Sequence, residues 1–329
     1  MNRNSDVKNG EILFLYDANM CNPNGDPDEE NRPRMDDVTR RALVSDVRLK
    51  RYLRDYWFEN ENTLNIRDVW VRKNDNGNVT TADNRLKDLK KRYKEITGRD
   101  PEDKDSTGDF KNWLLDELID VRLFGAVMPI VSSKTGSKSG GHITYTGPVQ
   151  FSWGYSLHPV EINPSNSITS TFAGRESQGK GEYGTIGKDW RVMYALIAFY
   201  GVISKARATK TNMKEDDLKL LRESLIKAIP AQSTTRSKIG QVPRLYVEVD
   251  YTGDFQGIGD LRDLVELKPE SKSASEEIRG TKDYIIDMKN LQEKLKQIQD
   301  KVASVYIWVH PSLRIINNTD LPKESRIEI

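Results

Sequence analysis

The chain has 329 residues, of which 36% are hydrophobic and 31% are charged, and its 51 Lys and Arg residues nearly balance its 50 Asp and Glu residues at a net charge of +1. This apolar content is enough for a real hydrophobic core, which excludes disorder as the main description. The longest apolar run, residues 192–203, is shorter than the roughly 20 residues of a membrane span, so we expect no membrane association.

The beginning of the chain indicates a cytoplasmic protein. Residues 1–10 lack the apolar stretch of a secretory signal, and the single cysteine, Cys21, cannot form an intrachain disulfide. Cys21 and the three widely separated histidines form no ligand-spaced motif, so we expect neither a metal nor another cofactor.

The first elements are a strand, a loop and a helix. Residues 11–16 are apolar and rich in aromatic and branched side chains, which predicts a buried strand. Residues 22–34 hold three prolines and many Asn and Asp residues, which predicts an irregular and functional loop. Residues 36–56 have helical periodicity. Their apolar stripe consists of Ala42, Leu49 and Leu53, and the remaining surface carries a cationic face with Arg48, Lys50, Arg51 and Arg54.

An insertion with its own surface is predicted next. Residues 57–122 combine a turn at 74–78 with a highly charged helix at 83–97 and an amphipathic helix at 109–124. A flexible Ser/Gly/Lys loop at 132–141 leads into a strand at 147–162. The Ser/Thr/Gly-rich residues 163–188 then fit an extended hairpin or a mobile loop.

The rest of the chain alternates strands and helices. We predict strands at 191–204, 244–249 and 304–309, and helices at 215–229 and 283–301. This order predicts an α+β fold, in which helices cover a sheet of the split βαβ or ferredoxin-like kind.

The charges segregate along the chain although they cancel overall. No acidic residue lies between Asp120 and Glu161, between Asp189 and Glu215, or between Glu223 and Glu248, whereas residues 248–277 are rich in acids. This pattern fits a basic groove for a polyanion beside an acidic flank, and chance clustering on solvated faces explains it equally well.

Catalytic motifs do not stand out. The glycine clusters match neither phosphate-binding nor dinucleotide-binding fingerprints, and no Ser-His-Asp arrangement is recognisable. Asp17, Asp26 and Asp28 could bind Mg²⁺ or act as a base, but turn formers that bond their own backbone are the commoner explanation of such residues. We therefore expect a protein that is not an enzyme.

Several separate segments combine cations with small polar residues, which suits binding of a nucleic-acid backbone. For each one alone, a solvated surface cation is the simpler explanation. Phe172, isolated in the polar hairpin, could stack on bases or pack locally. The cationic segments contain Arg32 and Arg34, the helix residues Lys50, Arg51 and Arg54, the loop residues Lys134 and Lys138, and residues 233–238.

The N-terminal motifs resemble a known family. Residues 22–28 (NPNGDPD), 31–36 (NRPRMD) and 45–54 (SDVRLKRYLR) are similar to the signature of the CRISPR Cascade backbone subunit, the Cas seven family of the RAMP superfamily, and closest to its type I-B branch (the Csh-two type). Three later motifs occur in the family's order, at residues 120–126, 146–152 and 233–238.

The resemblance implies an RRM-like (ferredoxin-like) palm with an inserted helical finger region and a β-hairpin thumb. The palm would contain residues 1–56, 146–162 and 189–329, the finger residues 57–145, and the thumb residues 163–188. A non-catalytic subunit of this kind polymerises head-to-tail along the crRNA and presents this guide to target DNA beside other Cascade subunits. A metal-dependent RNase of the type III backbone kind, using Asp26, remains the alternative, and a regulatory RNA binder that never polymerises is a third possibility.

The resemblance also implies which residues meet the guide. The basic helix and the facing loops would contact phosphates, and Phe172 would wedge beside a displaced base. The predicted RNA-binding residues are Asn24, Arg32, Arg34, Ser45, Lys50, Arg51, Arg54, Lys134, Lys138, Phe172, Arg175, Arg207, Thr235, Arg236, Ser237 and Lys238.

Overall fold

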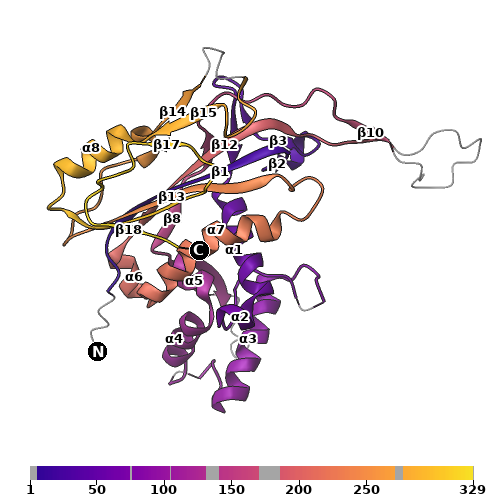
Figure 1. The fold of residues 1–329 in the computed structure, drawn as a ribbon. Helices are drawn as coiled ribbons and strands as arrows, with labels where there is room; N and C mark the ends of the chain where they lie inside the picture. The colour runs from indigo at the N-terminus through magenta and orange to yellow at the C-terminus, as the bar shows by residue number, and fades with distance from the viewer. Residues whose placement is uncertain are drawn as a thin grey trace, which may run out of the picture.

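A long antiparallel sheet forms the centre of the molecule (Figure 1). The computed structural model describes residues 6–74, 76–103, 105–130, 141–169, 186–270 and 277–328. The strand order is β18-β16-β13-β1-β12-β9-β5-β4, with β8 also paired to β12, and only β18 runs parallel to its neighbour. The strands are β1 (Gly10–Cys21), β4 (Met35–Asp36), β5 (Arg41–Val44), β8 (Val149–Phe151), β9 (Gly154–Ser156), β12 (Val192–Ile203), β13 (Gln241–Tyr251), β16 (Val302–Val309) and β18 (Glu324–Arg326).

Strand β1 is buried on both faces because its side chains alternate between two hydrophobic cores. Phe14 and Tyr16 belong to the core under helices α1 (Asp46–Glu59) and α7 (Glu215–Gln232). Leu13 and Leu15 belong to the opposite core. That second core is covered by η2 (Leu261–Leu264), α8 (Lys289–Gln297) and a small sheet of β14 (Glu266–Pro269), β15 (Tyr284–Asp287) and β17 (Ile315–Ile316).

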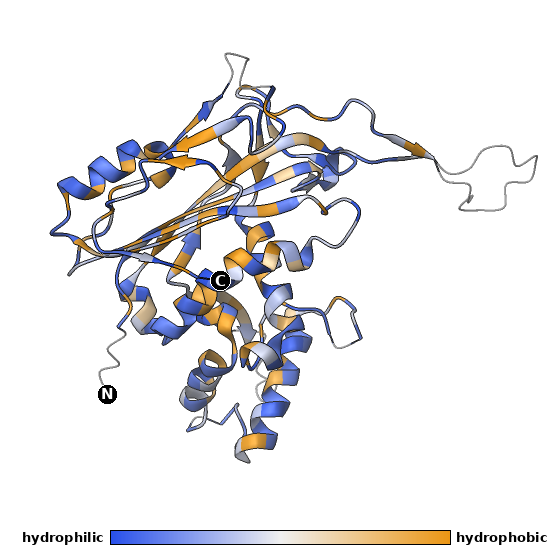
Figure 2. Cartoon of the chain, viewed as in Figure 1, coloured by the Kyte–Doolittle hydropathy of each residue, from blue (hydrophilic) through white to orange (hydrophobic). Residues whose placement is uncertain are grey.

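The helical insertion has a third core of its own and hangs below the sheet in Figure 1. Leu86, Tyr93, Phe110 and Leu114 form its centre. Hydrophilic and hydrophobic residues alternate along these helices, as the colours of Figure 2 show. The insertion contains α2 (Glu61–Leu64), α3 (Ala82–Thr97), α4 (Thr107–Glu117), α5 (Ile119–Phe124), β6 (Gly125–Ile130) and β7 (Gly141–Thr146).

Short elements complete the fold. An arm extends from the sheet and contains β10 (Ser167–Thr169) paired with β11 (Ile186–Lys188) (Figure 1). Helix α6 (Lys205–Thr211) follows β12. The N-terminal loop holds β2 (Gly25–Asp26), η1 (Pro27–Glu29) and β3 (Arg32–Pro33). No helix in the described ranges is both long and apolar enough to cross a membrane.

Several predicted elements were wrong in type or extent. The first helix begins at Asp46 rather than near residue 36, because residues 41–44 form strand β5 between β9 and β4, and Ala42 lies in that strand. The predicted loop at 22–34 contains the β2–β3 hairpin. The helix predicted at 109–124 is interrupted by the extended backbone of Leu118.

Two further elements differ from the prediction in the same way. The strand predicted at 147–162 is split into the short strands β8 and β9. The helix predicted at 283–301 begins with strand β15, whose four residues pair with β14 and β17 before α8 starts. In each case pairing with a distant segment overrides the local periodicity.

Two acids of the predicted acidic flank lie in the core instead. Glu248 is fully buried and accepts hydrogen bonds from Arg222 Nε at 2.8 Å and Nη2 at 2.7 Å. Asp250 is also buried on β13, and one of its carboxyl oxygens has no hydrogen-bond partner. Burial and the neighbouring charge of Glu248 raise the pKa of Asp250 to about 8.

We expect Asp250→Asn to stabilise the fold at pH 8. An aspartate in the unfolded chain has a pKa of about 3.9, so the stability that protonated Asp250 provides is complete below pH 4 and is lost as the pH rises through 8. Asparagine stays neutral, so the Tm at pH 8 should rise by about 2–5 °C, with little change at pH 4. Asp254→Asn, at a side chain that is 96% exposed, is the control. An unchanged Tm for Asp250→Asn at pH 8 would contradict the assignment.

Candidate nucleic-acid interface

One end of the central sheet collects several of the predicted site residues. At this end β1 finishes, while β12 and β13 begin. The backbone N–H of Asn22 donates to Ser237 O at 2.8 Å, and that of Asn19 donates to Gly240 O at 2.9 Å. The loops 22–34 and 233–240 therefore pack against each other, and the N-terminus of α1 joins them through Asn24.

Asn24 and Ser45 cap the basic helix. Asn24 Oδ1 accepts hydrogen bonds from Ser45 N at 2.9 Å and Ser45 Oγ at 3.0 Å. Ser45 Oγ in turn accepts from Arg48 N at 3.3 Å, as an N-cap side chain does. The loop motif thereby holds the start of α1, whose remaining N–H groups and partial positive charge attract anions.

Arg48 is the cation nearest to this helix start. Its guanidinium carbon lies 4.1 Å from the ring centroid of Tyr52, and its buried Nε has no hydrogen-bond partner. Arg48 was on the predicted cationic face but was not among the predicted RNA-binding residues. Its position three residues after a capping serine was the signal that could have selected it.

The loop after α7 adds two more cations. Lys238 Nζ donates to Asn22 O at 2.5 Å and to Pro23 O at 3.4 Å. Burial, and then the charge of Arg48, lower the pKa of Lys238 to about 8. Arg236 is exposed and makes no ion pair with any described residue. We call Arg48, Arg236 and Lys238 the cationic cluster.

Thr235 and Ser237 belong to the same loop. Thr235 is exposed, and its carbonyl accepts from the N–H groups of Lys238 and Ile239, which closes the turn that presents Arg236. The hydrogen bond from Asn22 to the Ser237 carbonyl fixes this turn to the first loop.

The later residues of α1 already have partners inside the protein. Lys50 is 8% exposed and bonds to Asp46 at 3.0 Å and to Gln150 at 3.2 Å. Arg51 pairs with Asp55 at 2.7 Å through its Nε. Arg54 Nε donates to the buried Asp120 at 2.8 Å. Their assignment as RNA contacts stays a prediction, although each would have to leave its carboxylate to reach a phosphate.

Arg32 and Arg34 lie on the β2–β3 hairpin rather than in the cationic cluster. The guanidinium of Arg32 lies 5.5 Å from the ring centroid of Trp190, and that of Arg34 lies 5.9 Å from the ring centroid of Trp153. Arg34 is also paired with Asp26 at 2.8 Å. Asp26 caps η1 by accepting from Asp28 N, as a turn former does. No group of three or more potential metal ligands occurs among the described residues.

The remaining predicted residues lie elsewhere. Arg207 is exposed on α6, which follows the far end of the 12-residue strand β12, roughly 40 Å from the cationic cluster at about 3.3 Å per residue. The other four, Lys134, Lys138, Phe172 and Arg175, lie outside the described residues.

The stretches of sequence without acidic residues do not form a continuous basic surface in the fold, because several of their arginines are ion-paired. Arg122 pairs with Asp217 at 2.8 Å, Arg191 with Asp189 at 2.8 Å, and Arg244 with Asp17 at 2.8 Å. Asp217 and Asp17 come from distant segments and Asp189 borders its stretch, so the local charge in the sequence overstates the free positive charge of the fold.

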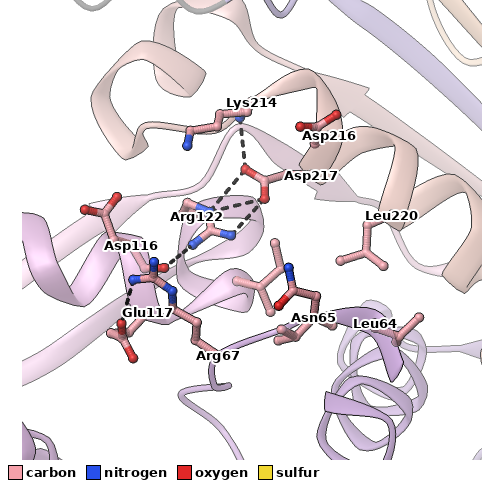
Figure 3. A pocket seen from close by; sticks show the side chains of 12 residues that line it. Leu64, Asn65, Arg67, Asp116, Glu117, Arg122, Lys214, Asp216, Asp217 and Leu220 are labelled. Atoms are coloured by element: carbon pink, nitrogen blue, oxygen red, sulfur yellow. Dashed lines mark hydrogen bonds and ion pairs between the residues drawn. The ribbon is translucent and has the colours of Figure 1, made fainter. Parts of the chain in front are cut away.

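A cavity of about 480 Å³ between the insertion and α7 is also internally neutralised (Figure 3). Arg122 bonds to Asp217 across it, and Arg67 reaches Glu117 at 2.9 Å. The cationic cluster, not this cavity, leaves positive groups open to an anion.

Cations beside a helix start, at one end of an α+β sheet, can hold a phosphate. A family model described as CRISPR-associated protein Cas7 matches residues 8–289. A CRISPR-associated protein Cas7 of Haloferax volcanii is 34% identical over 312 residues, which cover 92% of this chain and 86% of that protein. The chain belongs to the Cas7 family.

The fold agrees with that membership. A solved chain from a "CRISPR RNA-guided surveillance complex, pre-nicking" superposes with a TM-score of 0.51 at 14% identity, over 98% of this chain and 96% of that chain. At this identity the likeness concerns the α+β fold.

Proposed function

We propose that this chain is a non-catalytic backbone subunit of a CRISPR RNA-guided surveillance complex (Cascade) of a type I, I-B-like system. It binds the crRNA and polymerises head-to-tail along it beside other Cascade subunits. The guide that it holds then pairs with target DNA. Membership of the Cas7 family supports the proposal, and the cationic cluster at the start of α1 is the observation that carries it.

The cationic cluster suits a phosphate backbone of any sequence. Arg48 offers a buried donor that lacks a partner, Arg236 projects from an exposed turn, and Lys238 adds an ammonium group. Such contacts neutralise phosphates and read no base, as a subunit that must accept any guide requires. In this proposal Lys50 and Arg54 join α1 to Gln150 and Asp120 of other segments rather than contact the guide.

The proposal includes an RRM-like palm, a finger and a thumb. The order β13-β1-β12-β8, with α1 after β1 and α7 after β12, supports a ferredoxin-like palm. The separate core of residues 57–145 supports a finger, and the arm from β10 to β11 supports a thumb within 163–188 (Figure 1).

The alternative function is cleavage of RNA by Asp26. The pairing of Asp26 with Arg34, together with its role as the cap of η1, favours a structural role for this carboxylate. If the alternative holds, RNA will shorten in the presence of Mg²⁺ and Asp26→Ala will abolish the loss.

The test is the mass distribution of the full chain mixed with a guide-length single-stranded RNA, with the recovered RNA checked for length. Regularly spaced masses of several copies on intact RNA are expected. A single copy per RNA would contradict the polymerising subunit, and shortened RNA would contradict a non-catalytic one.

Binding should also depend on pH through Lys238. With a pKa of about 8 in the free protein, Lys238 must take up a proton to bind a phosphate in alkaline solution. The affinity for single-stranded RNA should therefore fall about tenfold from pH 7 to pH 9. Lys238→Arg stays charged and should remove this dependence, as titrations at constant ionic strength would show. An equal fall in both proteins would exclude Lys238 as its source.

A further inference from the structure

Trp153 is a large aromatic residue at the surface beside the proposed interface. It lies between β8 and β9, and its side chain is 48% exposed. Its backbone is fixed, because Trp153 O accepts a hydrogen bond from Arg262 Nη1 at 2.8 Å. An exposed tryptophan on a rigid strand connection presents a flat apolar surface.

A small cavity of about 210 Å³ opens beside this ring. Its volume is below the roughly 300 Å³ at which sites for drug-sized molecules begin, so it suits one ring system rather than a whole nucleotide. Its lining includes Trp153 with Asp26, Glu29, Arg32, Arg34 and Asp37.

The charges around the cavity select a base over a phosphate. Arg34 is neutralised by Asp26 at 2.8 Å. Glu29 and Asp37 make no ion pair with any residue that the structure describes. Arg32 offsets one of these carboxylates, so the two arginines and three acids of the lining leave a net charge of −1. This charge repels a phosphate, whereas an uncharged aromatic base meets no such repulsion.

Backbone and side-chain contacts of the first loop join the lining of the cavity to the start of α1. Arg34 N donates to Asn24 O at 3.0 Å, and Asn24 holds Ser45. Val44, directly before Ser45, is the register partner of Gly154, the neighbour of Trp153. These contacts place Trp153 next to the start of α1, where the cationic cluster lies.

We infer that an unstacked nucleobase of the bound single-stranded RNA lies on Trp153 in this cavity. The inference rests on the proposed function, because the RNA must first be held by the cationic cluster. Stacking tolerates any sequence, since every base has an aromatic face. Trp153 thus adds affinity for the bases where the cationic cluster supplies affinity for the phosphates.

The test compares two single-stranded RNAs of equal length, one unmodified and one abasic throughout. Trp153→Ala should bind the unmodified RNA about tenfold more weakly and the abasic RNA as tightly as the unaltered protein does. Trp153→Phe should restore most of the affinity. The slope of affinity against salt should not change, because no phosphate contact is removed.

Val38→Ala is the matched control, since Val38 is 92% exposed near the cavity but does not line it. The inference is overturned if Trp153→Ala binds unmodified RNA normally, or if it weakens both RNAs equally. It is also overturned if Trp153→Ala still binds RNA as a single copy but no longer forms complexes of several copies. A neighbouring protein, and not a base, would then fill the cavity. In all these cases the unaltered protein would still bind abasic RNA, so the proposed function would stand.

Discussion

Replacing Arg48 and Arg236 together by glutamine should weaken the binding of single-stranded RNA by about a hundredfold, whatever its sequence. Hydrogen bonds to charged groups contribute about 1.5–3 kcal/mol each, and two such contacts are removed. The slope of log affinity against log salt should fall by about 1.4, at roughly 0.7 per phosphate of a single strand. Neither arginine makes an ion pair with a described residue, so no carboxylate loses its partner and the fold should survive.

Arg51→Gln is the matched control for this double variant. Arg51 lies on the same helix, but its guanidinium is paired with Asp55, and its side chain is 33% exposed. Its substitution should change the affinity less than twofold. If Arg51→Gln weakens binding as much as the double variant does, the guide follows the flank of α1 and not the cationic cluster.

Arg54→Ala should lower the stability of the protein by about 3 kcal/mol rather than act on RNA directly. Asp120 is fully buried, and besides Arg54 it accepts backbone N–H groups from Trp70 at 2.7 Å and Val71 at 3.2 Å. Removal of the guanidinium leaves a buried carboxylate without a counter-ion, which costs about 3–5 kcal/mol. Thermal unfolding would show a Tm lower by several degrees.

A second substitution separates this effect from guide binding. Arg54→Met combined with Asp120→Asn removes both charges and should recover much of the stability. At low temperature, folded Arg54→Ala should bind RNA with nearly unchanged affinity. If Arg54→Ala leaves the Tm unaltered but weakens RNA binding, Arg54 contacts the guide directly.

Long, strongly patterned segments were predictable from the sequence. The strand expected at 191–204 is β12, and the charged helix expected at 83–97 is α3. The strand is a continuous apolar run, as a strand buried on both faces requires, and the helix carries Leu86, Leu89 and Tyr93 at helical spacing. The strand β5 was missed because its four residues are helical in pattern, and they form a strand by pairing with β4 and with β9, which lies more than a hundred residues away.

The site shows the same limit. The loop motifs and the order of the segments were enough to select Asn24, Ser45 and residues 235–238, which the structure brings to one place. The pairing of the helix cations was not predictable from the sequence, because Lys50 bonds to Gln150 and Arg54 bonds to Asp120, both in distant segments. Pairing of this kind depends on tertiary contacts, which helical periodicity does not reveal.

The root of the arm is tied to the loop that carries the cationic cluster. Arg191, three residues after β11, donates to Met20 O at 2.6 Å and to Arg236 O at 3.1 Å. A movement of the arm therefore displaces the turn that presents Arg236, and an occupied turn restrains the arm in return. Thermodynamic linkage makes this coupling reciprocal. A protein that binds the arm changes the affinity for the guide by a certain factor, and the bound guide changes the affinity of that protein for the arm by the same factor. In the proposed polymer, a neighbouring copy that contacts the arm would in this way change the affinity for the guide.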